Sequence, residues 1–233
     1  MTVSDFPPAR AAIFDMDGLL VDTEPFWRSV EVEVFAELGV DITPLIDRGL
    51  TMGMRLDEVV AFFRSRIGWD GPGDEEIAGR IVSGIVSAVH HEAKLLPGAV
   101  DAVDLLSGYG LATALASGST PPVIEAVLDR FELADRFAVV SSAADDRLGK
   151  PHPAILLRTA AALGVDALEC VVLEDSINGC VAAKAARMRL VAVPGERFSS
   201  DARFAIADVR LASLEQVGDA AVTELLGLEP ARS

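Results

Sequence analysis

A four-residue apolar run that stops at an acid constrains the fold of this chain more than any other stretch. Residues 11–14 read Ala-Ala-Ile-Phe, and Asp15 follows directly, with Asp17 and Gly18 close behind. A short apolar run bounded by charge is typical of a buried strand in a parallel sheet. Asp15 and Asp17 should then lie at the carboxyl edge of that sheet, where open α/β folds bind their ligands.

Two carboxylates this close in the sequence support two interpretations. Asp15 and Asp17 repel one another unless they share a cation, and Gly18 leaves room for a ligand or a tight turn. The functional interpretation is a magnesium site in which one carboxylate acts as a nucleophile. The alternative is a solvated turn between a strand and a loop, and this short motif by itself leaves both open.

Beyond Pro97 the chain alternates between strand-like and helix-like segments. The predicted strands lie at 111–116, 137–141, 170–174, 189–194 and near 209–211, with helices between them and a last helix near 213–226. This alternation favours right-handed crossovers and a doubly wound parallel sheet. The strand at 11–14 must join the same sheet, so the predicted fold class is α/β with a Rossmann-like core.

The segment between the first strand and Pro97 has a different character. Helices are predicted at 24–38, 55–67 and 74–93, and no strand pattern lies among them. We therefore expect an α-helical cap, residues 22–96, inserted after the first strand of a single core made of residues 1–21 and 97–233. At 233 residues the chain is long enough for one sizeable core and a smaller insertion.

Composition narrows the class of partner. Hydrophobic residues make up 51% of the chain, which favours a folded globular protein over a disordered one. The net charge of −16 disfavours nucleic acid, which requires a basic binding surface. A small anionic substrate is still compatible with this charge, because salt screens exposed charges beyond roughly 8–10 Å.

The cysteines, the histidines and the first residues of the chain indicate the cellular compartment and the type of metal. Cys170 and Cys180 are ten residues apart and are best interpreted as small core residues in a reducing compartment. His90, His91 and His152 have no spacing typical of zinc, and we expect surface or helix roles for them. The first residues show no secretion signal, and no apolar run is long enough to span a bilayer, so we expect a cytoplasmic protein without a membrane partner. We expect a monomer.

Later strands also end in polar groups suited to phosphate or metal. Ser117 and Gly118 follow the second strand just before a helix start, where the Ser117 hydroxyl, nearby backbone N–H groups and the helix N-terminus can form a phosphate cradle. Lys150 stands in a Gly-Lys-Pro-His-Pro loop, and Glu174 and Asp175 end the fourth strand, where they can complete a magnesium shell. Each feature alone has a plainer explanation: an ordinary helix start, a solvated lysine, or acids that cap a helix.

Together the four features resemble the haloacid dehalogenase superfamily of phosphohydrolases over nearly the whole chain. FDMDGLLVDTE resembles its first motif, LASGS its second, the lysine of GKPHP its third and LEDSING its fourth. The helical insertion resembles the superfamily's α-helical cap. The second aspartate of the first motif fits the phosphatases rather than the dehalogenases. Several further segments resemble bacterial sugar-phosphate phosphatases of the hexitol phosphatase and 2-deoxyglucose-6-phosphate phosphatase type.

The resemblance implies a reaction and a role for each motif residue. It implies hydrolysis of a small hexose or hexitol phosphate through an aspartyl-phosphate, with Asp15 as nucleophile and Asp17 as general acid and base. The implied phosphate ligands are Ser117, Gly118 and Lys150. The implied Mg²⁺ ligands are Asp15, Asp17 through its main-chain carbonyl, Asp175, and Glu174 through water.

Two other functions and three cap residues complete the predictions. The related β-phosphoglucomutases carry a cap histidine and a cap lysine where this chain has Trp27 and Ile85, so hydrolysis is favoured over isomerisation. A non-catalytic binding protein on the same fold has less support, because all four motif positions are filled. Arg55, Glu24 and Trp27 are candidates for substrate contact, although surface charges and a core aromatic explain them more simply.

Overall fold

The core of the molecule is a six-stranded, all-parallel sheet. The computed structural model describes residues 7–48, 50–51 and 54–227. The strands are β1 Ala11–Phe14, β2 Ala112–Ser117, β3 Val139–Ser142, β4 Cys170–Glu174, β5 Arg189–Ala192 and β6 Val209–Arg210, in the spatial order β3-β2-β1-β4-β5-β6. The first strand therefore lies in the middle of the sheet, and the strand order reverses between β1 and β4. This arrangement confirms the predicted doubly wound α/β fold.

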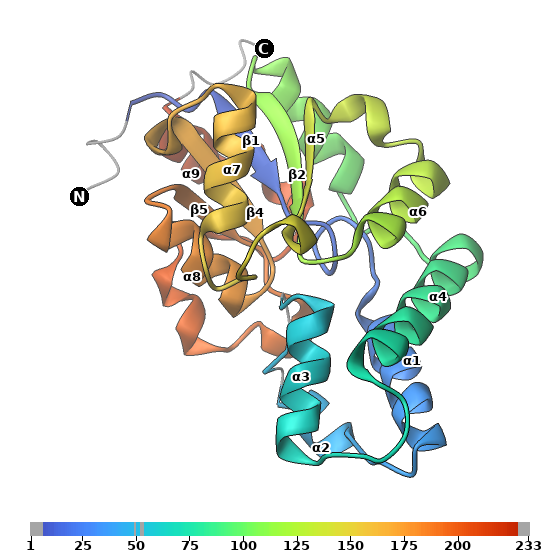
Figure 1. Ribbon diagram of the computed structural model, residues 1–233. Helices are drawn as coiled ribbons and strands as arrows, with labels where there is room; N and C mark the ends of the chain where they lie inside the picture. The colour runs from blue at the N-terminus through green and yellow to red at the C-terminus, as the bar shows by residue number, and fades with distance from the viewer. Residues whose placement is uncertain (1–6, 49, 52–53, 228–233) are drawn as a thin grey trace.

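Both faces of the sheet are covered. Alternate residues of a strand point to opposite faces, so Ala12 and Phe14 join one apolar cluster and Ala11 and Ile13 join the other. The covering helices are α5 Ala99–Gly108, α6 Pro121–Phe131 and α9 Ala220–Leu226 on the first cluster and α7 Ala154–Leu163 and α8 Ile177–Ala185 on the second (Figure 1). Cys170 and Cys180 are free, fully buried members of the second cluster, as predicted.

Four helices form the inserted cap at the lower end of Figure 1: α1 Glu24–Glu37, α2 Thr43–Ile46, α3 Leu56–Arg66 and α4 Asp74–Glu92. Aromatic rings fill the space between them, with the Phe35 ring centroid 5.3 Å from that of Phe63 and 5.1 Å from that of Trp69, both edge to face. The apolar residues spaced by four along α4, including Ile85, are completely buried. These contacts stabilise the cap through burial of apolar surface.

The chain passes between core and cap twice, and the two passages pair with each other. Val21 and Leu95 form an isolated antiparallel bridge. The N–H of Asp22 donates to the Lys94 carbonyl at 3.0 Å, and the N–H of Leu96 donates to the Leu20 carbonyl at 2.9 Å. We keep residues 22–96 as the proposed limits of the cap.

Three details differ from the sequence prediction. β3 begins at Val139 rather than 137, because Phe137 turns into the core, where its ring packs against the edge of Phe14. The helix predicted near 213–226 is divided into a 3₁₀ turn at Leu214–Gln216 and α9, since Gly218 and Asp219 interrupt it. The one-turn helix α2 was not predicted, because it is too short to show a helical period.

Candidate active site

The predicted polar residues meet where the strand order reverses. Phe14, the last residue of β1, is paired with Leu115 of β2 on one side and Leu173 of β4 on the other. Asp15 therefore emerges between the end of β2 and the end of β4. Parallel strands present their carboxyl ends at one edge, so this register brings three motifs together without any further adjustment of the chain.

A buried lysine joins two of these motifs. The Lys150 Nζ atom lies 2.7 Å from Asp15 Oδ1 and 2.7 Å from Glu174 Oε2. The side chains of Lys150 and Glu174 are 1% and 0% exposed, and that of Asp15 is 5% exposed. A buried charge is tolerated only with well-placed partners, and Lys150 supplies them to both acids at once.

Glu174 is held on both of its oxygens. Its Oε1 accepts from the Asp175 N–H at 3.2 Å, the Ser176 N–H at 3.1 Å and the Ser176 hydroxyl at 2.9 Å. Burial alone raises the pKa of this carboxyl, but Lys150 and the Ser176 hydrogen bonds outweigh burial and hold the pKa below its ordinary value. The same pair of acids raises the pKa of Lys150 in spite of burial. Glu174 is therefore an ionised, fixed group.

Three carboxylates at this edge are close enough to hold one metal ion. In the described part of the chain, Asp15, Glu174 and Asp175 are the only such group, with ligand atoms within 4.8 Å of one another. Burial, then the neighbouring carboxylates, raises the pKa of Asp15 to about 8 and that of Asp175 well above its ordinary range. One lysine cannot balance three buried acids, and a set of oxygen donors suits Mg²⁺. The residues present thus fit the predicted metal.

Gly18 is required by this cluster. Its φ of +76° lies in the left-handed region, and a Cβ atom there would stand 2.2 Å from Asp175 Oδ2. Any side chain at this position would therefore displace a candidate metal ligand. His90, His91 and His152 are exposed and lie outside the cluster, as predicted.

Asp17 has a separate environment made of hydrogen-bond donors. Its Oδ1 accepts from the Thr23 hydroxyl at 2.7 Å and the Trp27 indole Nε1–H at 3.1 Å. Its Oδ2 accepts from the Ser117 hydroxyl at 3.0 Å and the Ser119 hydroxyl at 2.7 Å. The carboxylate of Asp17 thus faces these four donors, and it does not belong to the three-carboxylate cluster.

The predicted phosphate ligands fall into two groups. Gly118 and Ser119 line the pocket that opens above Asp15, directly before the N-terminus of α6. Ser117 is fully buried: its hydroxyl donates to Asp17 and accepts from the Ser119 N–H at 3.0 Å. Lys150 lies beneath Asp15 and holds that carboxylate rather than lining the pocket.

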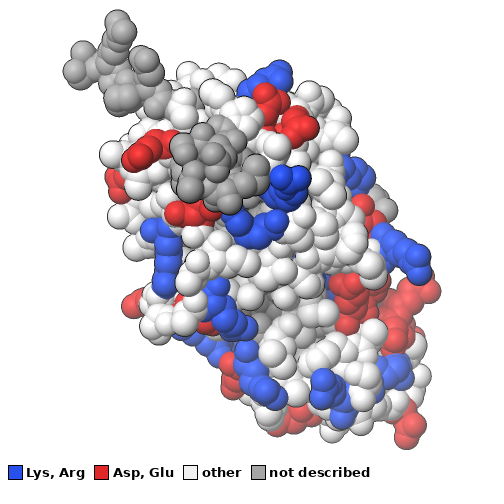
Figure 2. Space-filling view, turned by 90° about the vertical axis from the view of Figure 1, so that its left-hand side faces the viewer, with Lys and Arg blue, Asp and Glu red and all other residues white. Residues whose placement is uncertain are grey.

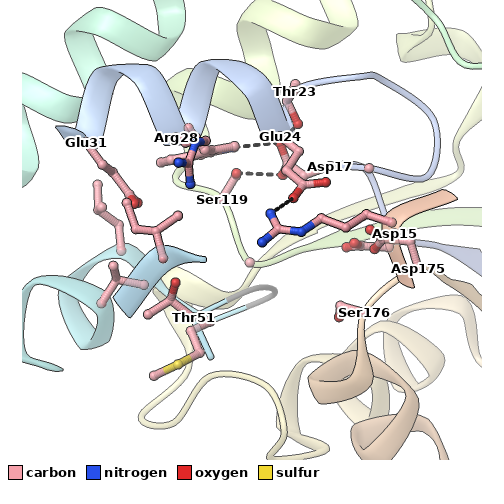
Figure 3. A pocket seen from close by; sticks show the side chains of 18 residues that line it. Asp15, Asp17, Thr23, Glu24, Arg28, Glu31, Thr51, Ser119, Asp175 and Ser176 are labelled. Atoms are coloured by element: carbon pink, nitrogen blue, oxygen red, sulfur yellow. Dashed lines mark hydrogen bonds and ion pairs between the residues drawn. The ribbon is translucent and has the colours of Figure 1, made fainter. Parts of the chain in front are cut away.

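The pocket lies between the core edge and the cap (Figure 3). Its volume of about 130 Å³ is several times the space one water needs, so it can take a small organic ligand. Glu24 and Trp27, two of the three cap candidates, line it, whereas Arg55 does not. Instead, Arg55 donates to the Asp146 carbonyl and joins the cap to a core loop.

Several pocket residues were not found from the sequence. Ser119 donates to Asp17, and Arg197 reaches from a core loop to the cap, where it donates to the Asp47 carbonyl at 2.6 Å and lies 3.9 Å from Glu24 Oε1. Glu31 lines the cap end of the pocket. The spacing of four between Thr23, Trp27 and Glu31 was a usable signal, because it places them on one helix face. Nothing in the sequence around Arg197 indicates its contact with the cap.

Side chains of both charges lie on the face of the molecule shown in Figure 2. Over the described part of the face in Figure 2, lysine and arginine side chains are interspersed with acidic ones and with large uncharged areas. None of the helices in the described ranges combines the length and the apolar character needed to cross a membrane.

Comparison with known proteins identifies the family. The model of the haloacid dehalogenase-like hydrolases matches residues 9–187, which include all four motifs. The chain belongs to this family. The predicted superfamily is thereby confirmed. The hexitol phosphatase relatives described next confirm the predicted enzyme class, a phosphatase.

Named relatives of this hydrolase cover nearly its whole length. Hexitol phosphatase B of Escherichia coli (strain K12) is 46% identical over 207 residues, which are 89% of this chain and 93% of that protein. The crystal structure of CbbY from Rhodobacter sphaeroides in complex with phosphate has a TM-score of 0.82 at 30% identity and covers 92% of this chain and 99% of that one. A β-phosphoglucomutase of Clostridium difficile has a TM-score of 0.80 at 22% identity, with 94% and 97% covered, and shows a shared fold.

Proposed function

We propose that this hydrolase is a Mg²⁺-dependent phosphatase that cleaves a small sugar or sugar-alcohol phosphate through an aspartyl-phosphate. One observation carries the proposal: Lys150 holds Asp15 at the floor of a pocket, and a second carboxylate, Asp17, lies nearby and accepts hydrogen bonds from four donors. A fixed nucleophile beside a separate proton carrier is what a two-step phosphoryl transfer requires.

The metal would bind at the three-carboxylate cluster. Asp15 and Asp175 would supply carboxylate oxygens, Asp17 its main-chain carbonyl, and Glu174 a contact through water, since Mg²⁺ commonly keeps several waters. When bound, the ion supplies charge stabilisation for the phosphoryl oxygens. Lys150 orients Asp15 and lowers its pKa against the effect of burial, and the bound ion would favour the ionised form further. The backbone N–H of Gly118, next to the α6 N-terminus, would be offered to the phosphate.

Asp15 and Asp17 account for every bond and proton in the two proposed steps. First, an oxygen of Asp15 bonds to phosphorus, the bond between phosphorus and the sugar oxygen breaks, and Asp17 gives that oxygen a proton. Then a water oxygen bonds to phosphorus, its proton passes to Asp17, and the bond to Asp15 breaks to release phosphate. Asp17 ends as it began, ready to protonate the next leaving group.

The hydrogen bond from Trp27 supports the assignment of the proton to one oxygen of Asp17. An indole N–H can only donate, so Oδ1, which accepts from Trp27, stays an acceptor. The partners of Oδ2 are the hydroxyls of Ser117 and Ser119, which can donate or accept. We therefore assign the transferred proton to Oδ2.

Hydrolysis is favoured over isomerisation by the same residues. Trp27 occupies the position of the mutase cap histidine and cannot carry a proton between substrate atoms. Ile85, at the predicted position of the mutase cap lysine, is completely buried on α4 and does not line the described pocket. Similarity to Escherichia coli hexitol phosphatase B supports a hexitol phosphate, or a hexose phosphate, as the substrate class.

A comparison of Asp15→Asn with Asp17→Asn tests the assigned roles. Asp15→Asn should form no phosphoenzyme from any substrate. Asp17→Asn should give a burst of nitrophenolate from p-nitrophenyl phosphate and a trapped phosphoenzyme, because this leaving group needs no proton while the water step loses its base. With a hexitol phosphate the same variant should be slow from the first step, by roughly 10²–10⁴-fold.

Asp22→Asn is the matched control, since Asp22 is an exposed aspartate in the same loop. It should retain wild-type kinetics with both substrates. Wild-type turnover of hexitol phosphate by Asp17→Asn, or normal Mg²⁺ binding without a burst, would show that Asp17 is not the acid and base. Conversion of β-glucose 1-phosphate to glucose 6-phosphate at the rate of hydrolysis would favour the mutase.

A further inference from the structure

Three polar residues lie at intervals of about one turn along the inner face of α1, beginning with its N-cap, Thr23. Thr23 and Trp27 both donate to Asp17, and Glu31 follows four residues later on the same face. The rise of the helix places Glu31 about 6 Å beyond Trp27 along the axis. Figure 3 shows Glu31 extending from α1 at the end of the pocket opposite to Asp15 and Asp175. The helix thus connects the reaction centre with the far end of the pocket.

Glu31 is a buried carboxyl without a partner. Its residue is 7% exposed, and within the described ranges its side chain makes no hydrogen bond and no ion pair. The pocket surface around the cap end is largely apolar, with Ile46, Met54 and Val59 among its lining residues. Arg28, the cation on the same helix, binds Asp47 instead. An unpaired buried carboxyl is costly, so the arrangement is complete only when a ligand supplies donors.

The chemistry of Glu31 selects the ligand group. Burial raises its pKa to about 8, so at neutral pH the group is often protonated and can both donate and accept. A second phosphate or carboxylate would be repelled by the ionised form, and an apolar group would leave the carboxyl unpaired. Neighbouring hydroxyls on a sugar or polyol chain satisfy both oxygens in either protonation state.

The spacing indicates the length of the ligand. An extended chain advances roughly 3.3–3.6 Å for every three bonds, so five carbon–carbon bonds span roughly 6 Å. That is the axial separation of Trp27, which holds Asp17, from Glu31. A six-carbon polyol whose phosphate oxygen lies at Asp17 can therefore extend along α1 by about the rise between Trp27 and Glu31, whereas the two carbon–carbon bonds of a three-carbon chain span less than half of that rise.

We propose that Glu31 is the specificity-determining residue that binds the hydroxyl groups at the end of the substrate remote from the phosphate. This inference rests on the proposed function, and it narrows the substrate class to phosphate esters of six-carbon polyols and sugars with free hydroxyls at that end.

The test compares two substrates that differ in chain length. The values of kcat/KM with Mg²⁺ are measured for a hexitol 6-phosphate and for glycerol 3-phosphate, with the wild type, Glu31→Gln and Glu31→Leu. Loss of a hydrogen bond to a buried acid should lower the ratio of the two values by roughly 10- to 100-fold in Glu31→Leu. Glu31→Gln should retain part of the preference, because its amide still donates and accepts.

Glu33→Gln and Glu33→Leu are the matched controls, because Glu33 is an exposed glutamate on the same helix. Their ratio should equal that of the wild type. An unchanged ratio in Glu31→Leu, whether both values fall together or neither falls, overturns the inference. If Glu31→Leu does not fold, the near-isosteric Glu31→Gln decides the outcome through the same ratio.

A binding measurement separates the inference from the proposed function. In the Asp15→Asn background, a hexitol 6-phosphate should raise the Tm, and Glu31→Leu should remove that shift while Glu33→Leu preserves it. If the wild type hydrolyses no phosphate ester but the shift depends on Glu31, the proposed function fails and the inference stands. If the wild type hydrolyses p-nitrophenyl phosphate but no hexitol phosphate shifts the Tm, the inference fails and phosphatase activity stands.

Discussion

At the floor of the pocket, Lys150 lies 2.7 Å from both Asp15 and Glu174, whereas at the cap end Glu31 has no partner among the described residues. The floor is fixed before any ligand arrives, which suits a group common to every substrate, the phosphate. The cap end is completed only by a ligand. A change at the floor should therefore affect all substrates alike, and a change at the cap end should alter the preference among them.

Removal of the metal should have the largest effect and should not depend on the substrate. Excess chelator should lower the rate with hexitol phosphate and with p-nitrophenyl phosphate by roughly 10³-fold or more, because several kcal/mol of charge stabilisation is lost. Mg²⁺ should restore the rate, and Ca²⁺ should not, since its looser geometry misplaces Asp15. Full activity in excess chelator would refute the metal site.

The metal should also be visible without turnover. At a Mg²⁺ concentration of 100 times the Kd, binding should stabilise the fold by about 2.7 kcal/mol and raise the Tm by roughly 5–10 °C. Replacing Asp175 by Asn should reduce this shift. An equal Mg²⁺ shift in the wild type and Asp175→Asn would place the ion elsewhere.

Lys150→Met should have the next largest effect, again equal for both substrates. It leaves two buried acids without their cation, so kcat/KM should fall by orders of magnitude, and stability should fall by about 3–5 kcal/mol. Lys184→Met is the control, since Lys184 pairs with Asp208 at 2.8 Å in a more exposed setting. A folded Lys150→Met with near-normal kinetics would show that Lys150 is an ordinary loop lysine.

At the cap end, Glu31 should make stability depend on pH. Its pKa is near the ordinary value of 4.5 when unfolded and about 8 when folded, so between these values ionisation favours the unfolded state. Below pH 4.5 Glu31 is protonated in both the folded and the unfolded state. Above that pH the destabilisation of the folded state by Glu31 grows, until pH passes 8. Glu31→Gln should therefore gain on the order of 3–4 kcal/mol relative to the wild type from pH 5 to pH 8.

Thermal melts across this pH range measure that gain, with Glu33→Gln as the reference. A constant difference between Glu31→Gln and the wild type would mean that Glu31 is ionised throughout, with a partner that the apolar surroundings do not suggest. The cap end would then resemble the floor, and the contrast between the two would disappear.

The smallest effect should follow from Trp27→Phe. Trp27 lies between the floor and the cap end of the pocket. The ring remains, but the N–H donated to Asp17 is lost, so kcat with hexitol phosphate should fall roughly 10-fold. The fall should be smaller with p-nitrophenyl phosphate, because its leaving group needs little protonation. Trp69→Phe is the control, since its indole donates to the Pro72 carbonyl within the cap. An equal fall with both substrates would argue for a packing role.

The sequence predicted the fold and the floor for the same physical reason. Apolar runs that stop at polar residues define parallel strands, and parallel strands bring their carboxyl ends to one edge, so Asp15, Ser117 and Glu174 had to meet. The period of four along α4 likewise predicted its buried face. The divided C-terminal helix was missed because Gly218 interrupts a pattern that otherwise continues.

The cap end was not predictable to the same degree. Which helix face of α1 meets the core depends on the packing of α1 against α4, not on any local preference, so Trp27 was interpreted mainly as a core aromatic although its N–H also donates to Asp17. Arg197 lies in a core loop, 150 residues after Asp47, the cap residue to which it donates. The assigned roles, the limits of the cap, the cytoplasmic location and the monomeric state stay predictions.

The paired passages at Val21 and Leu95 have a consequence for how such an enzyme changes over generations. Because the two ends of the inserted segment leave the core side by side, the core's own path is the same whatever lies between them. Doubling the length of a connection whose ends are already together costs only about 0.6 kcal/mol. Insertions, deletions and repacking within the cap can therefore accumulate while the strands and their acids are inherited unchanged, and a lineage can acquire new substrates without rebuilding its chemistry.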